Sequence, residues 1–413
     1  MKDIPKVEIK RIKDDILSLA TIGHNEQDRG IYRMAFSDED MAGKNWLLNR
    51  IEEAGLESAS DGAANISGIL PGEEDASRVF VGSHIDTVPC AGMFDGTLGV
   101  VVGLECLRVL KQAGFSPKKT IELIAFSDEE GRFGGTFGSE AFTGLLTLEK
   151  VRNAVDLNGV KLENAMLHHG LDPMRALEAR RLPDQIDSYL ELHIEQGPVL
   201  DQNHLQAGIV DSITGLRSWS LRLNGETNHA GTTPMDYRKD AFMGLADFAH
   251  EVPRILEENG GENSRATIGN AEILPGAPNS VPGAVEFSLD FRDPSTDTLE
   301  DLSQAFLKAI AAISRKRGLQ FETNVQGEIL PVKSDERLVD ILEEEAERLE
   351  LLTKRMLSGA AHDAQLVGRI APMAMIFVPS KGGLSHSPGE WTAWEDIEAG
   401  ANLMLAALIR LVK

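Results

Sequence analysis

The order of predicted elements changes twice along the chain, and this change constrains the fold more than any other feature. Residues 1–210 alternate strands with helices, as α/β units do. Between 211 and 330 the order becomes strand, helix, strand, strand, helix, strand, which is the split arrangement of a ferredoxin-like domain. Helix, strand and helix then return. We therefore predict an α/β domain made of residues 1–210 and 331–413, with a ferredoxin-like (α+β) domain of residues 211–330 inserted into it.

Hydrophobic periodicity supplies these elements. In the outer domain we predict strands at 77–83, 120–127 and 373–380, and helices at 97–114, 335–351 and 395–413. In the insert we predict strands at 215–225, 265–274, 284–292 and 320–329, and helices at 239–259 and 298–318.

Composition excludes several classes of partner. The 413 residues carry a net charge of −24, which argues against binding to nucleic acid or to an anionic membrane surface. An anionic substrate would need a local cationic pocket. No apolar run approaches the roughly 20 residues of a membrane-spanning helix. The chain has two cysteines, and its first 15 residues lack the apolar core of a secretory signal, so we expect a cytoplasmic protein.

The stretch GSHIDTVPCAGMFDG, residues 82–96, places polar side chains between a strand and a helix. His84, Asp86 and Asp95 therefore follow the carboxyl end of a strand, where open α/β sheets bind ligands. A second polar group, DEEG, follows the next predicted strand at residues 128–131. Both groups are expected at one edge of the sheet.

Imidazoles and carboxylates at such positions are the ligand types that Zn²⁺, Mn²⁺ or Ni²⁺ accept. The candidates are His84, Asp95, Glu130, His193 and His386. Because a carboxylate has two oxygens, one aspartate can bridge two ions roughly 3.5–4 Å apart. The set therefore suits a two-metal site.

Two further carboxylates have roles beside these ligands. With Glu130 as a ligand, the adjacent Glu129 is placed to act as a general base. Asp86 has the spacing to hold the second nitrogen of the His84 imidazole. Taken singly, each signal is also typical of a surface histidine or a solvated turn. Their order along the chain, from HIDT to MFDG, DEEG, ELHIEQGP and GGLSHSPGE, favours a site.

These motifs resemble the amidase group of the aminoacylase/carboxypeptidase superfamily of two-metal enzymes. That group holds N-carbamoyl-L-amino-acid hydrolases, allantoate amidohydrolases and β-ureidopropionases. The resemblance extends from GIYRMAFSDED through GETNHAGTTPM and PNSVPGAVEFSLDFRDP to SHSPGEWT. In ELHIEQGP, His193 stands where the peptidase relatives usually carry an acidic ligand, which favours an amidase.

The resemblance implies a mixed-sheet, two-metal, aminopeptidase-like catalytic domain with an inserted lid or dimerisation domain. One divalent ion (Mn, Zn, Co or Ni) would be held by His84, Asp95 and His193, and the other by Asp95, Glu130 and His386. Glu129 would be the base, Asp86 the orienting carboxylate, and His229 a donor to the oxyanion, reaching the partner's site in a homodimer. Substrate contacts would come from Gln196, Arg217, Asn279 and Arg292. Without the resemblance, Arg292 reads as a partner of Asp293 and His229 as part of a turn.

Two positions depart from the family pattern. Ala361 in SGAAHD replaces a glycine whose backbone approaches the substrate, so the pocket shape is open. Cys90 lies near the expected metals, where we interpret it as a packed residue because five ligands already fill the site.

The sequence thus predicts a metal-dependent hydrolase of the carbamoyl (ureido) C–N bond in N-carbamoyl-L-amino acids or a relative such as allantoate. A metal-bound water would attack, with Glu129 as base, and Arg292 would bind the carboxylate of a small ureido or amide substrate. The alternatives are an aminoacylase or dipeptidase, and a metal-dependent binding protein without catalysis. Retention of Glu129 argues against the last.

Overall fold

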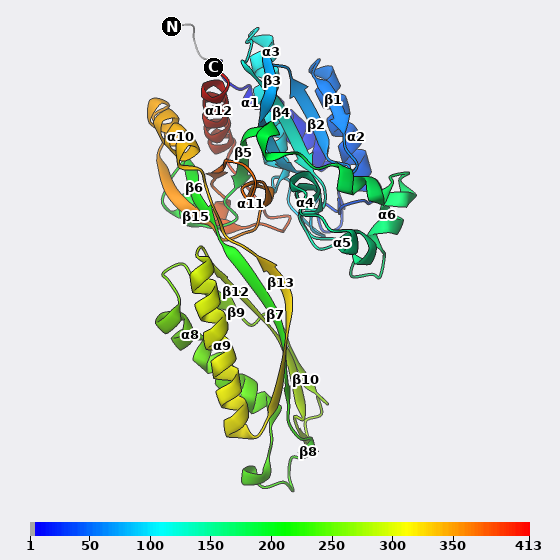
Figure 1. Cartoon of the computed structure of the whole chain (residues 1–413), viewed down its shortest axis with the longest axis vertical. Coiled ribbons are helices and arrows are strands. Elements are labelled where there is room, and N and C mark those ends of the chain that lie inside the picture. Colours follow the sequence, from blue (N-terminus) through cyan, green and yellow to red (C-terminus); the bar gives the residue numbers. More distant parts are fainter. Residues whose placement is uncertain (1–4) are drawn as a thin grey trace. The chain divides into compact units, whose positions relative to one another are not determined.

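A computed structural model describes residues 5–413, apart from the side chains of residues 75 and 76. Residues 1–4, which begin the segment predicted to lack a secretory signal, lie outside the described residues. The chain divides into two compact units, whose elements Figure 1 labels. Unit 1 runs up to Asp211 and resumes at Lys333–Lys413, and unit 2 is Ser212–Val332.

Unit 1 is built on a nine-stranded mixed sheet in the order β1-β2-β4-β3-β5-β16-β6-β14, with β15 paired to β6 outside this path. Strands β4, β3, β5 and β16 are mutually parallel, whereas β2 and β6 pair antiparallel to their neighbours. The predicted α/β class with a mixed sheet is therefore confirmed. The strands are β1 (Glu57–Ser60), β2 (Ile66–Leu70), β3 (Glu74–His84), β4 (Lys119–Phe126), β5 (Ile186–Ile194), β6 (Ala207–Ile213), β14 (Val332–Lys333), β15 (Thr353–Ser358) and β16 (Met373–Val378).

Helices cover this sheet, and α3 shows why the sequence folds in this way. Its first 14 residues, TLGVVVGLECLRVL, are all buried, because the helix packs on β3, β4 and β5 and against α1 and α12. The helices are α1 (Ile9–Ala20), α2 (Asp38–Glu53), α3 (Thr97–Gln112), α4 (Phe137–Thr143), α5 (Leu148–Asn153), α6 (Leu162–His168), α7 (Val199–Gln202), α10 (Glu336–Arg348), α11 (Asp363–Val367) and α12 (Trp394–Leu411). Short 3₁₀ turns lie at η1 (Pro173–Glu178), η2 (Pro183–Gln185) and η4 (Lys381–Gly383).

The four parallel strands place their carboxyl ends at one edge of the sheet. β3 ends at His84, and β5 ends one residue after His193. Glu129 follows β4 and His386 follows β16. Polar residues that are far apart in the sequence therefore reach the same edge, as ligand sites in open α/β sheets do.

Unit 2 contains an antiparallel sheet in the order β10-β12-β7-β13, with β9 paired to β12, and two helices that pack against it. Its main elements follow the predicted order of strand, helix, strand, strand, helix, strand. The predicted strand at 265–274 is broken at Gly269, because glycine weakens a strand interior. The elements are β7 (Gly215–Asn224), β8 (Asn228–His229), η3 (Met235–Tyr237), α8 (Ala241–Asn259), β9 (Arg265–Thr267), β10 (Ala271–Leu274), β11 (Ser280–Val281), β12 (Ala284–Asp293), α9 (Thr296–Arg317) and β13 (Gln320–Ile329).

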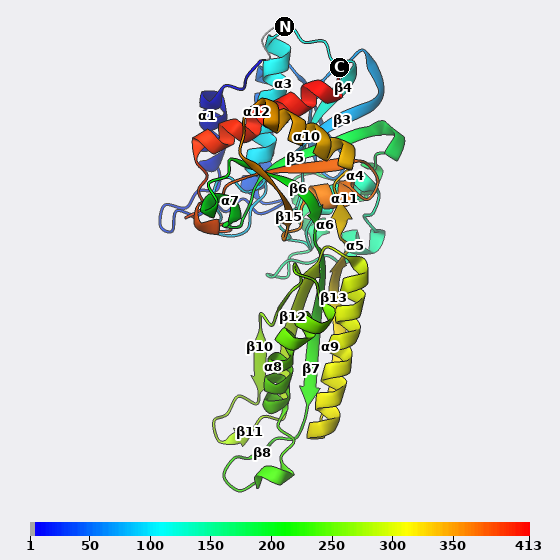
Figure 2. The same cartoon turned by 90° about the vertical axis from the view of Figure 1, so that its left-hand side faces the viewer.

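The two faces of the unit 2 sheet differ. Burial alternates along β7 and β12, so that residues such as Leu221 and Phe291 form a core with α8 and α9. The intervening residues, including Arg292, lie on the face that the helices do not cover. Beyond the far end of β7, β8 and β11 form a separate two-stranded ribbon, which Figure 2 shows at the tip of the unit.

Among the described residues, none of the helices is long and apolar enough to cross a membrane.

Candidate metal centre

Asp95 joins two groups of side chains at the carboxyl edge of the unit 1 sheet. Its Oδ1 lies 3.2 Å from His193 Nε2 and 3.7 Å from His84 Nε2. Its Oδ2 lies 3.4 Å from His386 Nε2, which is also 3.4 Å from Glu130 Oε2. Within each group the potential ligand atoms lie within 4.8 Å of one another. The structure thus brings the five predicted ligands together, with one oxygen of Asp95 turned to each group.

Gly96 allows the strand-end histidine to approach Asp95 closely. Its φ is +60°, and a Cβ on this residue would lie 2.3 Å from Cε1 and Nε2 of His84. The Gly96 amide also donates a hydrogen bond to His193 Nε2, at 3.2 Å. The residue after the bridging aspartate is therefore required to be glycine for both conformational and steric reasons.

Asp86 holds the main chain of the DEEG turn. Its carboxylate accepts hydrogen bonds from the amides of Glu129 and Glu130, at 3.3 and 3.2 Å. We expected this carboxylate to hold Nδ1 of His84, but it lies 3.8 Å away, and the main-chain oxygen of Asp86 lies at 3.1 Å instead. The turn so held places Glu129 Oε2 3.5 Å from His84 Nε2.

Burial dominates the electrostatics of the centre. It lowers the pKa of His84 to about 4, which leaves a neutral ring with a free lone pair. Burial, followed by neighbouring carboxylates, raises the pKa values of Glu129 and Glu130 well above their ordinary range. Burial alone would lower the pKa of His193, but the hydrogen bond and charge of Asp95 outweigh it and raise this pKa to about 9.

The donor set fits divalent cations. Buried carboxylates that crowd together are costly unless positive charge compensates them. Glu130 Oε1 and Gln196 Oε1 are both buried without a hydrogen-bond partner among the described residues. Imidazole nitrogens and carboxylate oxygens suit borderline divalent metals. Cys90 belongs to none of the candidate clusters in the described part of the chain.

His193 also belongs to another buried group, with Glu191 and His362. There, however, the Glu191 carboxylate already accepts hydrogen bonds from Ser83 Oγ, Tyr189 OH and the amide of Ala364. Its oxygens are thus occupied by the fold, and we favour Asp95 as the carboxylate that shares an ion with His193.

Sequence reasoning missed Arg33, a buried cation that supports the centre. Its Nε donates to the carbonyl of Ile85 at 2.6 Å, and its Nη2 donates to Thr97 Oγ1 at 3.1 Å. Its Nη1 donates to two carbonyls at the end of α1. Ile85 lies in the first ligand-bearing bend and Thr97 follows the second, so one guanidinium ties both. An arginine within the apolar stretch GIYRMAF was the available signal.

Glu390 was also missed, although it stands in the SHSPGEWT motif. Its Oε1 accepts hydrogen bonds from the amides of Phe94 and Asp95, at 2.7 and 3.2 Å. Ser385 Oγ lies 3.1 Å from Glu390 Oε2 and 2.7 Å from Asp95 Oδ2. Glu390 therefore connects the segment before α3 to the loop that carries His386.

The predicted substrate contacts fall on both units. In unit 1, Gln196 Nε2 donates to Asp95 Oδ2 at 2.7 Å, so this side chain adjoins the centre. In unit 2, His229 and Asn279 lie together on the ribbon of β8 and β11: His229 pairs with Ser280, and the Ala230 amide donates to the Asn279 carbonyl at 2.8 Å. The His229 and Asn279 side chains are exposed, and His229 Nδ1 accepts the amide of Gly231.

The two arginines of unit 2 lie on opposite faces of its sheet. Arg292 is on the face away from the helices, where its Nε contacts Asp290 Oδ1 at 3.0 Å. Arg217 pairs in register with Phe291 and points to the helix side, where it contacts Glu328 and Glu300 at 2.7 and 2.9 Å. One small molecule therefore does not reach both guanidinium groups of one sheet.

Comparison with known proteins places this site in a family. The sequence matches Peptidase family M20/M25/M40 over residues 80–410. The chain belongs to this family. Among its members, allantoate amidohydrolase of Bacillus subtilis is 37% identical over 410 residues, and N-carbamoyl-L-amino-acid amidohydrolase of Paenarthrobacter aurescens is 34% identical over 408 residues, each comparison covering 98% of both chains. A hydantoinase/carbamoylase family amidase of Burkholderia multivorans has a TM-score of 0.89 at 33% identity, again over 98% of both chains.

These findings confirm the resemblance to the amidase group and the fold class expected from it. The M20/M25/M40 family member described here is a hydrolase that acts on C–N bonds. Its candidate ligand clusters are consistent with a metal-dependent site at the carboxyl edge of the sheet.

Proposed function

We propose that this chain hydrolyses the carbamoyl (ureido) C–N bond of N-carbamoyl-L-amino acids or of a close relative such as allantoate. The observation that carries the proposal is the placement of Asp95 between two imidazole-containing groups, with Glu129 beside them. Relatives that span nearly the whole chain are named for hydrolysis of N-carbamoyl-L-amino acids and of allantoate. The imidazole of His193, in place of an acidic ligand, also favours an amidase over a peptidase.

The proposed cofactor is a pair of divalent ions, Mn²⁺, Zn²⁺, Co²⁺ or Ni²⁺. His84, Asp95 and His193 would hold one ion, and Asp95, Glu130 and His386 the other. When bound, such ions polarise a carbonyl oxygen and lower the pKa of water. His84 is suited to this role because burial keeps its ring neutral.

Glu129 carries the proton transfers in the proposed mechanism. As base it takes a proton from the attacking water, and as acid it returns a proton to the leaving nitrogen. The carboxylate of Asp86 fixes the main chain of Glu129 and thereby its reach. His229 would donate a hydrogen bond to the oxyanion that forms at the ureido carbon. From an N-carbamoyl amino acid the products would be the amino acid, CO₂ and ammonia.

Arg292 is the proposed partner of the substrate carboxylate. It lies on the uncovered face of the unit 2 sheet, with its side chain 37% exposed, so that part of the guanidinium is open to a ligand. A planar guanidinium binds a carboxylate through two parallel hydrogen bonds. It would supply the local positive charge that an anionic substrate needs in a chain of net charge −24.

We further propose that each site is completed by two chains of a homodimer. On β12, Arg292 pairs with Leu216, whereas Ala284 at the other end pairs with Asn224. Eight residues separate Arg292 from Ala284, which is roughly 27 Å of extended strand. The ribbon with His229 and Asn279 lies beyond Ala284 (Figure 2). One small substrate cannot span that length, so a site that uses both ends takes them from different chains.

The compartment remains as proposed from the sequence. Both cysteines, Cys90 and Cys106, are free thiols in the described structure, in agreement with a reducing cytoplasm. A chain stabilised by disulfides would have indicated an oxidising compartment instead.

Ammonia release tests the proposed function. The purified protein would be stripped with a chelator and reloaded with Mn²⁺, Co²⁺, Ni²⁺ or Zn²⁺. Each form would be assayed with N-carbamoyl-L-amino acids, allantoate and N-carbamoyl-β-alanine, and separately with N-acetyl amino acids and dipeptides. We expect ammonia from a ureido substrate, and only after metal is restored.

The other outcomes distinguish the rival functions. Preference for N-acetyl amino acids would identify an aminoacylase, and preference for dipeptides a dipeptidase. Tight binding of a ureido compound without turnover, in every metal-loaded form, would identify a binding protein. Full activity in the stripped protein would contradict the proposed use of metal.

A further inference from the structure

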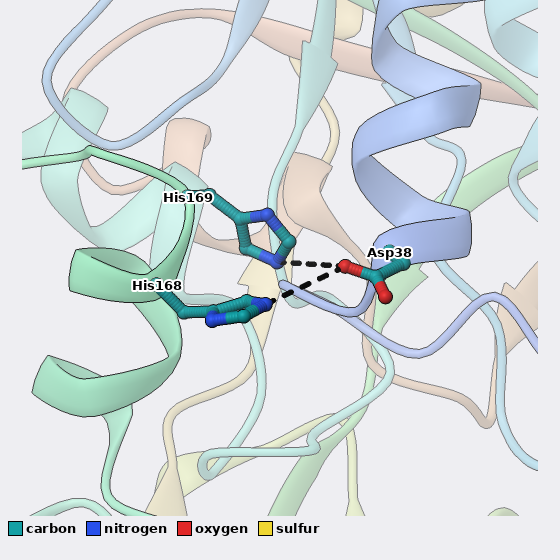
Figure 3. Close-up of side chains that lie close together, drawn as sticks. All are labelled: Asp38, His168 and His169. Atoms are coloured by element: carbon teal, nitrogen blue, oxygen red, sulfur yellow. Dashed lines mark ion pairs between the residues drawn. The ribbon is translucent and has the colours of Figure 1, made fainter.

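A second group of potential metal ligands lies outside the candidate metal centre, between α2 and α6. Asp38 is the first residue of α2, His168 is the last residue of α6, and His169 follows it. Their ligand atoms lie within 4.8 Å of one another. Figure 3 shows both imidazoles turned toward the same carboxylate oxygen. We call these three residues the α2–α6 cluster.

The distances in this cluster are close to those of a metal site. Asp38 Oδ1 lies 3.7 Å from His168 Nε2 and 3.9 Å from His169 Nε2. A tetrahedral zinc ion with ligands at about 2.0–2.1 Å holds neighbouring ligand atoms roughly 3.3 Å apart. Rotations of exposed side chains close this difference, because Asp38 is 82% exposed and His168 is 71% exposed.

We propose that the α2–α6 cluster binds one borderline divalent cation, with Zn²⁺ as the reference ion. Asp38 Oδ1, His168 Nε2 and His169 Nε2 would be its protein ligands, and water would complete the coordination. Two imidazoles and one carboxylate are ligands that such ions accept, whereas Ca²⁺ and Mg²⁺ prefer oxygen alone.

The surroundings leave room for the ion and its water. The three residues line a surface pocket of about 270 Å³. Arg132 also lines this pocket, but its Nε contacts Asp156 Oδ2 at 3.1 Å, which offsets its charge, and its Nη1 donates to the Ala35 carbonyl. The pocket therefore has no uncompensated cation among the described residues that line it.

His169 sets the proton balance of binding. Its Nε2 lies 3.2 Å from the carbonyl oxygen of Phe36, so a neutral ring that carries its proton on Nε2 donates to this carbonyl. When Nε2 binds the ion, the proton must lie on Nδ1, and the Phe36 carbonyl loses that donor. His169 is 13% exposed, so it is the least mobile of the three ligands and fixes where the ion binds.

The consequence is a link between segments 130 residues apart in the chain. An ion that binds the folded chain and not the unfolded one stabilises the fold in proportion to ln(1 + [L]/Kd). None of the three residues belongs to the proposed catalytic set. Zinc at this cluster would thus raise the unfolding temperature without a role in hydrolysis.

The test counts zinc and follows unfolding in the full chain. His168→Gln and Asp38→Asn remove one ligand each, and His250→Gln, an exposed histidine of α8 in no candidate cluster of the described residues, is the matched control. Each protein would be equilibrated at a series of buffered free zinc concentrations. Bound zinc would be measured by elemental analysis, and unfolding temperature by calorimetry with zinc and with chelator.

We expect wild type and His250→Gln to bind one more zinc per chain than either cluster variant. Affinity for that zinc should fall by more than the roughly 10- to 100-fold that loss of an outer partner costs. All proteins should unfold at the same temperature in chelator, and only those with an intact cluster should gain the additional zinc-dependent rise. Equal zinc counts and equal rises in all four proteins would overturn the proposal. Zinc counting needs no turnover, so this outcome is separate from the substrate assay.

Discussion

Unit 1 and unit 2 hold their polar residues in opposite ways. In unit 1, His84, Asp95 and His193 are at most 4% exposed, and their positions are fixed by strand ends and by hydrogen bonds to neighbouring main chain. In unit 2, His229 and Asn279 are exposed on a two-stranded ribbon at the end of the sheet. The first arrangement organises charge within one fold. The second presents side chains that gain surroundings only from another surface.

The comparison predicts its largest effect at Glu129. Glu129→Gln removes a base without removing a proposed ligand, so turnover should fall by at least about 10²- to 10⁴-fold while both metals stay bound. Steady-state kinetics and elemental analysis would measure these quantities. Asp95→Ala is the matched control, because it removes the residue between both groups and should lose both ions. Near-normal turnover, or metal loss in Glu129→Gln, would contradict the assignment.

The next effect concerns the exposed ribbon. His229→Ala should lower kcat by about 10²- to 10³-fold, the range for loss of one oxyanion donor. Mixed with Glu129→Gln and reassembled from dissociated chains, it should recover activity, because one site of each mixed dimer is intact. Random pairing makes about half of the dimers mixed and restores roughly a quarter of wild-type sites.

Mass spectrometry of the intact assembly would verify that mixed dimers form. If they form and activity stays at the level of the separate variants, His229 acts within its own chain or not at all. The contrast between the units would then no longer imply a shared site.

A smaller effect is expected at Arg292. Arg292→Lys keeps the charge but cannot form the two parallel hydrogen bonds of a guanidinium. Loss of a charged hydrogen bond costs about 1.5–3 kcal/mol, so kcat/KM should fall by roughly 10- to 100-fold on a substrate with a free carboxylate. Its carboxamide analogue should show little change. Equal losses on the two substrates would exclude carboxylate recognition by this residue.

The smallest effect is expected at Arg217, which serves as the matched control for Arg292. Its guanidinium contacts Glu300 and Glu328, whose side chains are 54% and 43% exposed. Exposed pairs contribute at most about 1 kcal/mol, so Arg217→Lys should leave kcat/KM within about threefold and lower stability by less than that energy. Denaturant unfolding would measure the stability. A kinetic loss as large as that of Arg292→Lys would instead assign Arg217 to substrate binding.

The sequence predicted most of the fold because its elements have strong periodicity. Helix α9 and strands β7 and β12 begin and end within a few residues of the predicted bounds. The broken strand at 265–274 was not predicted, because a single glycine in an extended pattern does not by itself indicate a break. The candidate ligands were found because imidazoles and carboxylates recur after predicted strands.

Supporting residues were harder to predict, because their partners are main-chain atoms. Arg33 bonds to carbonyls and a hydroxyl that are distant in the sequence, and no spacing rule indicates them. For Asp86, the spacing correctly indicated proximity to His84 but not that its carboxylate would accept two amides of the DEEG turn. The α2–α6 cluster escaped notice because 130 residues separate Asp38 from His168.

The close contact between Gly96 and His84 restricts how variants of this chain can differ. Any side chain at position 96 would meet the imidazole ring at 2.3 Å, so the first effect of such a change falls on the ring's position and not on the hydrophobic core. Natural or engineered variants at this position should therefore remain folded and abundant while losing activity. In a screen that scores expression and turnover separately, position 96 would stand apart from the core glycines, and it would mark the geometry of the site from sequence data alone.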